Sequence, residues 1–271
     1  MKKLIPFLFI FSLIFGISCT RPLQESDTIS AENLLKQISE GKKLVIKNKT
    51  ITGVLDFTKI LDKDNNLPVS TIYIESELAF VNCTFEDSVL AYSFKNSILR
   101  TVFNKTVMFY ECKFLKNVQF SQTEFSKDVS FELSVVEGQA EFNGTDFSKG
   151  AIFAAANFMN DTKFLGCRFG GRTSFFKTMF KKSVLVQRAK FYEPVLFLDS
   201  HFYGYFEFSD NMCYDLPDFS NANFSDRVVF CNSVYYLGLK LSGSKVSNPE
   251  SVEQHGNYFV QSTEVKDIFN Q

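Results

Sequence analysis

Phenylalanine recurs along the middle of the chain at a spacing of alternately five and six residues. This step defines 25 positions from Ile98 to Phe230, and 21 of them are Phe. The other four are Ile98, Val136, Val186 and Cys213, which are residue types common in protein cores. An α-helix repeats every 3.6 residues and a plain strand every two, so neither element buries all of these positions. The pattern therefore predicts a chain that turns once in every step.

Small or β-branched side chains stand two residues before the Phe positions, as at Thr145, Ala156 and Val195. A polar residue usually lies between the two, which indicates very short strands with an in-out-in pattern. A β-helix buries such a series, because its turns stack about 4.8 Å apart and like positions form columns inside. The small residues leave room for the rings. The Phe residues expected in the core are Phe109, Phe114, Phe120, Phe125, Phe131, Phe142, Phe147, Phe153, Phe158, Phe164, Phe169, Phe175, Phe180, Phe191, Phe197 and Phe202.

Several triplets consist of a small residue, a polar residue and Phe. Clear cases are Ala156-Asn157-Phe158, Cys167-Arg168-Phe169, Ala189-Lys190-Phe191 and Ala222-Asn223-Phe224. The chain here resembles the pentapeptide-repeat family, and the alternating sixth residue departs from that family's strict unit of five. The resemblance implies an all-β fold, a right-handed four-sided β-helix in which each coil takes two five-residue and two six-residue steps. It covers residues 72–246, or about eight coils, and a longer step predicts a bulge at Glu86–Leu90.

Different patterns occur at the two ends of this region. Residues 30–41 predict a short amphipathic helix that begins at Ser30 and caps the first coil of a β-helix domain at 42–246. Residues 247–271 are expected to form a helical cap, a tail or a homodimer interface. The pattern does not predict the structure of residues 58–71 or 247–271.

The first residues predict an export signal. Lys2 and Lys3 precede an apolar run, so residues 1–18 are expected to be a signal peptide. Leu13 to Cys19 resembles a bacterial lipobox, although Gly16 stands where Leu is usual. This resemblance implies a lipid on Cys19 that holds the protein to a membrane of the bacterial cell envelope, with residues 19–29 as a tether. Secretion without a lipid, or a periplasmic location, is the alternative.

Composition excludes several classes of function. The formal net charge is −1, and loss of the two Lys in residues 1–18 makes it −3, so no nucleic-acid partner is expected. With only two His, no metal site and no cofactor are expected. His201 is expected to be a solvated surface residue.

The cysteines other than Cys19 are expected to be structural. Cys83, Cys112 and Cys167 fall in the column of small residues, and Cys213 takes a Phe position. Cys231 is the one expected to point outward.

The acidic residues considered for paired-carboxylate catalysis fall in different columns, so no catalytic site is expected. These residues are Asp146, Asp199, Asp210 and Asp218. One exposed feature remains, because Tyr192, Tyr214 and Tyr236 are evenly spaced, one coil apart, and should stack as an outward ladder. The ladder either binds a protein or glycan partner or only stabilises neighbouring coils.

These observations predict a non-catalytic scaffold or interaction protein anchored at the cell envelope. Two alternatives stay open. One is a mimic of duplex DNA that affects a topoisomerase, as the family resemblance allows, and the other is a β-helix enzyme acting on polysaccharides.

Overall fold

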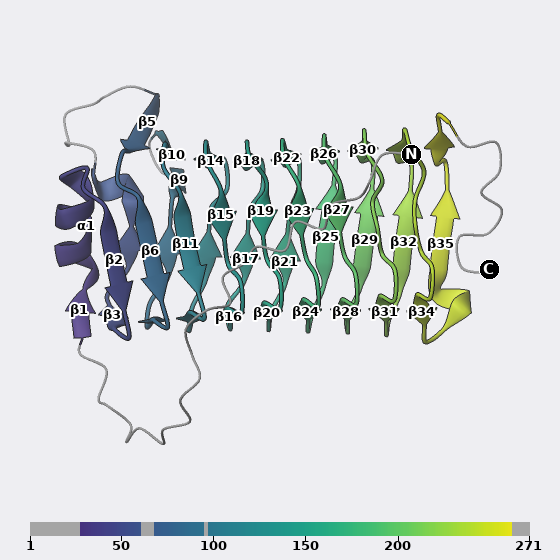
Figure 1. Cartoon of the computed structure of the whole chain (residues 1–271), viewed down its shortest axis with the longest axis horizontal. Coiled ribbons are helices and arrows are strands. Elements are labelled where there is room, and N and C mark those ends of the chain that lie inside the picture. Colours follow the sequence, from purple (N-terminus) through teal and green to yellow (C-terminus); the bar gives the residue numbers. More distant parts are fainter. Residues whose placement is uncertain (1–27, 61–67, 95–96, 262–271) are drawn as a thin grey trace, which may run out of the picture.

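The computed structural model describes residues 28–60, 68–94 and 97–261, which form one parallel β-solenoid (Figure 1). The predicted fold class is therefore confirmed. The expected signal peptide at 1–18 and Cys19 lie outside the described residues. The chain winds through four sheets, named here faces 1 to 4 in the order in which it passes them. Face 1 has ten strands, so there are about ten turns and not eight, because regular pairing begins well before residue 72.

The strands of the four faces are very short. Face 1 contains β1 (Thr28–Ser30), β3 (Thr50–Thr52), β7 (Thr84–Phe85), β12 (Lys113–Phe114), β16 (Val135–Val136), β20 (Asn157–Phe158), β24 (Met179–Phe180), β28 (His201–Phe202), β31 (Asn223–Phe224) and β34 (Lys245–Val246). Face 2 contains β4 (Leu55–Asp56), β8 (Val89–Leu90), β13 (Val118–Gln119), β17 (Ala140–Glu141), β21 (Thr162–Lys163), β25 (Val184–Gln187), β29 (Phe206–Ser209), β32 (Val228–Cys231) and β35 (Val252–His255). Face 3 contains β5 (Val69–Ile74), β9 (Tyr92–Phe94), β10 (Ile98–Phe103), β14 (Glu124–Phe125), β18 (Asp146–Phe147), β22 (Arg168–Phe169), β26 (Lys190–Phe191), β30 (Met212–Cys213), β33 (Val234–Tyr235) and β36 (Tyr258–Phe259). Face 4 contains β2 (Leu44–Lys47), β6 (Leu78–Val81), β11 (Val107–Tyr110), β15 (Val129–Ser130), β19 (Ala151–Ile152), β23 (Thr173–Ser174) and β27 (Val195–Leu196).

The core is a set of Phe columns. Every Phe residue that the sequence places in the core is buried. Phe153, for example, stacks between Phe131 and Phe175, with ring centroids 5.4 and 4.8 Å away. Phe142 and Phe164, from a different face, meet the same ring edge-on. Each ring therefore has stacked neighbours along its own column and tilted neighbours across the shaft, the two arrangements that aromatic pairs prefer.

The small residues that stand two places before the Phe positions also form hydrogen bonds. On faces 1 and 3 the hydroxyl and thiol groups of this column of small residues donate to the carbonyl of a core residue one turn earlier. Thr145 Oγ1 lies 2.6 Å from the carbonyl oxygen of Phe120, and Thr178 Oγ1 lies 2.7 Å from that of Phe153. An additional hydrogen-bond donor stabilises a buried carbonyl oxygen, so these positions favour Thr, Ser and Cys as well as Ala.

The alternation of five and six residues reflects two kinds of corner. The five-residue corners, which lead into faces 1 and 3, hold a residue at positive φ three places before the core position. Examples are Gln122 (φ 54°), Ala155 (φ 54°) and Asp199 (φ 56°). The amide of Thr123 then donates to the carbonyl of Phe120, which closes a tight turn. This left-handed conformation shortens the corner by one residue relative to the six-residue corners.

Two turns near the N-terminus are longer than the regular ones. Leu44 of β2 pairs with Leu78 of β6, and Leu78 pairs with Val107 of β11. Both pairs are further apart in sequence than the regular pair of Val107 and Val129. The predicted bulge at Glu86–Leu90 is misplaced, because β8 pairs in register there. The extra residues of the second long turn follow Ala91 instead and form β9, which runs antiparallel to β10. Ile98 belongs to this excursion and is half-buried, so it is not a core position.

The N-terminal end is covered by α1 (Ala31–Ser39), within the range expected for a capping helix. Ser30 is its N-cap, because its hydroxyl accepts a hydrogen bond from the amide of Asn33. Leu34 and Ile38 are buried against β4 and the 3-10 helix η1 (Phe57–Ile60), whereas Leu35 is only half-buried. Figure 1 shows α1 stacked on one end of the solenoid. Thr28 and Ile29, the last two residues of the expected tether, instead pair with β3 in the solenoid, and residues 19–27 lie outside the described part.

The C-terminal segment differs from the capping helix that was considered. Residues 247–261 form one more turn, made of the 3-10 helix η2 (Pro249–Ser251), β35 and β36. In this turn Cys231 pairs with His255, which lies two residues further along the chain than a regular partner would, because η2 lengthens the turn. The solenoid thus extends past residue 246, and the remaining residues 262–271 lie outside the described part.

Candidate binding surface

The three tyrosines of the expected ladder lie together on the outer side of face 3. Tyr192 stacks on Tyr214 with ring centroids 4.9 Å apart, and Tyr214 stacks on Tyr236 at 5.0 Å. The interplanar angles are 13° and 24°, so the rings are close to parallel. Tyr192 is 40% exposed, and the other two are half-buried. Each ring follows a core position of face 3 by one residue, which explains its outward direction.

The ladder continues into an arginine on the side of the earlier turns. The guanidinium of Arg168 lies 5.0 Å from the centre of the Tyr192 ring, a cation–π arrangement. Asp146 holds the same guanidinium at 2.9 Å, and these hydrogen bonds raise the pKa of Arg168 above its ordinary value. Gly170 makes space for this arrangement, because a Cβ there would lie 3.1 Å from the Arg168 Nη1 atom and 2.5 Å from the Ser148 carbonyl oxygen.

The ring faces of the ladder are mostly occupied by its own members. Arg168 covers one face of Tyr192, and the middle ring is sandwiched between its two neighbours. Val260 is aligned with Tyr236 in the last turn. The ladder therefore offers ring edges and phenol hydroxyls to a partner, and not the broad aromatic faces on which sugar rings stack.

Tyr203 and Tyr205, which lie close to the ladder residues in sequence, are on other sides of the solenoid. The ammonium of Lys181 lies 3.6 Å from the centre of the Tyr203 ring, which is 43% exposed. Tyr205 donates a hydrogen bond of 2.6 Å to Glu207, and burial together with this carboxylate raises the pKa of the phenol. Neither residue extends the Tyr192, Tyr214 and Tyr236 ladder.

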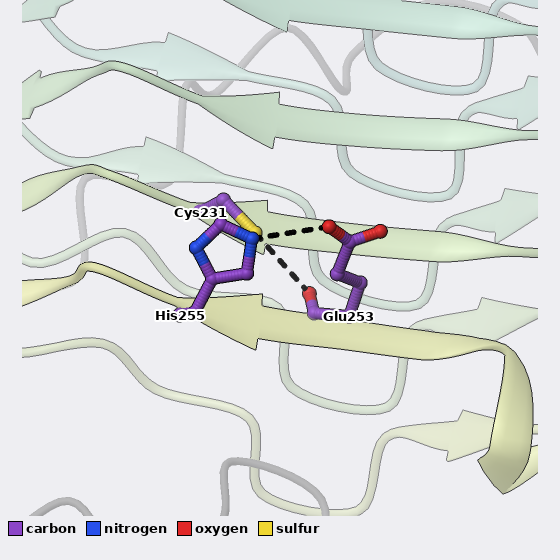
Figure 2. A group of neighbouring side chains, drawn as sticks. All are labelled: Cys231, Glu253 and His255. Carbon is purple, nitrogen blue, oxygen red and sulfur yellow. Dashed lines mark hydrogen bonds and ion pairs between the residues drawn. The ribbon is translucent and has the colours of Figure 1, made fainter.

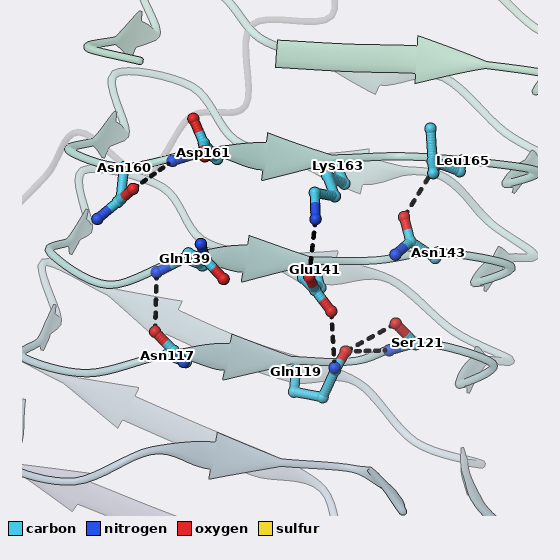
Figure 3. A network of polar contacts seen from close by, with 10 residues as sticks. All are labelled: Asn117, Gln119, Ser121, Gln139, Glu141, Asn143, Asn160, Asp161, Lys163 and Leu165. Carbon is cyan, nitrogen blue, oxygen red and sulfur yellow. Dashed lines mark hydrogen bonds and ion pairs between the residues drawn. The ribbon is translucent and has the colours of Figure 1, made fainter. Parts of the chain in front are cut away.

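Face 2 carries a network of polar side chains that links neighbouring turns (Figure 3). Glu141 accepts hydrogen bonds from Gln119 at 2.8 Å and from Lys163 at 3.1 Å, one turn to either side. Asn117 and Asn143 each accept a backbone amide of the next turn, from Gln139 and Leu165. These side chains link neighbouring turns, so we assign this network a structural role.

The acidic residues considered for catalysis are not brought together. Asp146 is bound to Arg168 on face 3, while Asp199 and Asp210 are corner residues at positive φ. Asp218 lies in line with face 4 and accepts a hydrogen bond of 2.9 Å from Lys240. Burial opposes its ionisation, but hydrogen bonds from Ser220 and Lys240 outweigh this and lower its pKa. The carboxylates of Asp146 and Asp218 are thus placed as acceptors of structural hydrogen bonds.

The cysteines are free thiols within the described residues. Cys83, Cys112, Cys167 and Cys213 are buried at their expected positions, and burial raises the pKa of Cys167 and Cys213. Cys231 lies on the outer side of face 2, as the sequence predicts, but it is only 4% exposed. Residues of the last turn cover it. The repeat pattern ends at residue 246, so the sequence does not predict that residues 252–255 cover Cys231.

The covering residues form a mixed group with Cys231, shown in Figure 2. Glu253 and His255 are neighbours of Cys231, and one potential ligand atom from each residue lies within 4.8 Å of the others. The regular repeat spacing does not predict this group, because His255 lies two residues beyond the position that would regularly be opposite Cys231. The other histidine, His201, lies on face 1 and is half-buried, with Nδ1 3.2 Å from the Asp199 carbonyl oxygen.

Comparisons with known proteins give one match. The family model described as pentapeptide repeats (9 copies) matches residues 109–156. No curated protein and no solved structure matches the chain significantly. Among the described residues, no helix has the length and apolar character needed to cross a membrane.

Proposed function

The chain belongs to the pentapeptide-repeat family, and from this premise we propose that it is a non-catalytic interaction protein of the bacterial cell envelope, anchored through a lipid on Cys19. Members of a solenoid family act through the surfaces that their stacked turns present. The observation that carries the proposal is the outward stack of Tyr192, Tyr214 and Tyr236. Exposed tyrosines are rigid and amphipathic, and they are enriched where proteins bind one another.

The two ends of the solenoid have different roles in this proposal. Eight residues separate Cys19 from β1, so a lipid on Cys19 would be linked to the end of the solenoid that α1 covers. The tyrosine ladder begins at the turn of β26, five turns beyond β5 on face 3. At the spacing of stacked strands this is roughly 25 Å along the axis. The fold would thus hold the ladder away from the membrane that carries the lipid.

A protein partner fits the ladder better than a glycan. Lectin-like sites use the open face of an aromatic ring, whereas the ring faces here pack on each other and on Arg168. Edges and phenol hydroxyls remain for a partner. Such groups give directional hydrogen bonds beside apolar contact, as in the central residues of protein interfaces.

The anchor is tested by metabolic labelling with a fatty-acid analogue and by cell fractionation. The wild type should carry the label and sediment with membranes. Cys19→Ala should lose both properties, and Cys167→Ala, which changes only a core thiol, should keep them. An unlabelled full-length protein in the cytoplasm would refute export and would make a topoisomerase assay the next step.

The ladder is tested by photo-crosslinking in the cells that produce the protein. A photoreactive residue at position 214 should yield a defined protein adduct, and the same residue at position 203, on another face, should not. Tyr192→Ala should reduce the adduct at 214. Identical adducts at both positions would contradict a specific surface, and retention on purified polysaccharide without any protein adduct would favour the glycan alternative.

A further inference from the structure

The group on face 2 formed by Cys231, Glu253 and His255 combines three residue types that bind transition metals (Figure 2). Cys231 pairs directly with His255 across strands β32 and β35. The thiol of Cys231 lies 3.7 Å from the carbonyl oxygen of Glu253, and His255 Nε2 lies 3.1 Å from Glu253 Oε1. Soft sulfur, imidazole nitrogen and carboxylate oxygen thus converge on one point at the protein surface.

The convergence is a consequence of the irregular last turn. The 3-10 helix η2 begins after Asn248, whose side chain accepts a hydrogen bond from the amide of Glu250. The two residues that η2 adds bring His255 opposite Cys231 and place Glu253 opposite Val229. Glu253 and His255 are two residues apart on one strand, so both side chains leave the same side of the sheet.

We propose that Cys231, Glu253 and His255 bind one Zn²⁺ ion, with a fourth position open to water or to another ligand. Tetrahedral zinc has bonds of about 2.3 Å to sulfur and about 2.0–2.2 Å to nitrogen and oxygen, which place ligand atoms roughly 3.3–3.6 Å apart. The three atoms already lie within 4.8 Å of one another. Rotation of the exposed His255 side chain can shorten the remaining distances, and it requires no movement of the strands.

The surroundings also suit a cation. Arg227 Nη2 holds Glu253 Oε2 at 2.5 Å, which leaves Oε1 for a metal and fixes the carboxylate in the way that outer contacts support metal ligands. The carboxylates of Glu253, Glu207 and Asp210 act electrostatically on the Cys231 thiol. These acidic neighbours disfavour a bare thiolate but favour a bound dication, which deprotonates a coordinating thiol.

The ligand set selects the type of metal. Calcium and magnesium prefer all-oxygen sites, whereas a thiolate with an imidazole favours zinc and similar transition metals. A bound ion would also link β35 to β32, and so fasten the last turn to the rest of the solenoid. This inference does not depend on the lipid anchor or on the tyrosine ladder.

The test is a titration of the reduced, folded full chain with Co²⁺ and then with Zn²⁺. We expect one equivalent of Co²⁺ to give a thiolate-to-cobalt charge-transfer band, and Zn²⁺ to remove it. Cys231→Ser should abolish the band, and His255→Asn should weaken Zn²⁺ binding at least tenfold. The control His201→Asn replaces the only other histidine and should bind as the wild type does.

A second measurement separates loss of ligands from loss of fold. Circular dichroism of each variant without metal should match that of the wild type, because the three side chains lie outside the Phe core. Excess Zn²⁺ should raise the melting temperature of the wild type and of His201→Asn but not that of Cys231→Ser. Absence of one-equivalent binding, Co²⁺ binding without a thiolate band, or unchanged affinity in His255→Asn would each overturn the proposal.

Discussion

The middle of the solenoid and its last turn follow the same winding with different means of stabilisation. In the shaft, residues 103–224, most interior positions hold Phe rings that stack from turn to turn. In the last turn, residues 247–261, Gln254 takes the place opposite Phe230, and Asn257 donates to the carbonyl of Phe230. Apolar burial is strong and cooperative along a column, whereas polar contacts at an end contribute less. The comparison indicates that the shaft is more stable than the last turn, and that substitutions in the last turn cost less stability.

The largest expected effect comes from removing one ring in the shaft. Phe153→Ala should destabilise the protein by about 3–5 kcal/mol, because Phe153 is fully buried and stacks on both sides. Phe259→Ala should cost no more than about 2 kcal/mol, because Phe259 is half-buried and, among the described residues, stacks on one ring alone, that of Tyr235. Denaturant unfolding of both variants measures the difference. Equal losses would show that the last turn is as firmly packed as the shaft.

The sequence predicted the shaft well because one residue type repeats there in one register. The sequence did not predict the strand pairing where the repeat is interrupted, at β9 and at η2. The length of an insertion does not show at which residue the regular pairing resumes. The sequence predicted the positions in the tyrosine ladder for the same reason that it predicted the core. The group of Cys231, Glu253 and His255 was missed because it depends on the two additional residues of η2.

A smaller effect is expected from the hydroxyls of the small column. Thr178→Val should cost about 1 kcal/mol, because the lost hydroxyl donates to the buried Phe153 carbonyl one turn earlier at 2.7 Å. Thr162→Val on face 2 is the matched control. Its hydroxyl makes only a local contact of 3.3 Å to the Asn160 carbonyl oxygen, so its loss should stay below about 0.5 kcal/mol. Equal costs would mean that the column serves only to leave space.

The corners of the shaft test the left-handed conformation separately from packing. Gly166 has φ +66°, and a Cβ added there would meet no atom within 4 Å. Gly166→Ala should therefore cost about 1 kcal/mol, through backbone strain alone. Ala155→Gly, at an equivalent corner with φ 54°, removes the same strain and should not destabilise the protein by more than about 0.5 kcal/mol. Thermal unfolding of the two variants measures these costs. A melting temperature of Gly166→Ala equal to that of the wild type would show that the left-handed conformation causes no strain there.

The smallest effect concerns an ion pair in the turns that join the shaft to its end. Lys240 and Ser220 lower the pKa of Asp218, so the folded state binds this proton less readily than the unfolded state does. The stability that the carboxylate adds is present above its unfolded pKa, near 4, and is lost as the pH falls through the lower pKa of the folded state. Asp218→Asn should remove this part of the acid dependence, within about 1 kcal/mol, as expected for a partly exposed pair. Melting temperatures of both proteins, measured from neutral pH downward, should therefore converge in acid. Parallel curves would show that the pair contributes nothing to holding the last turns on the shaft.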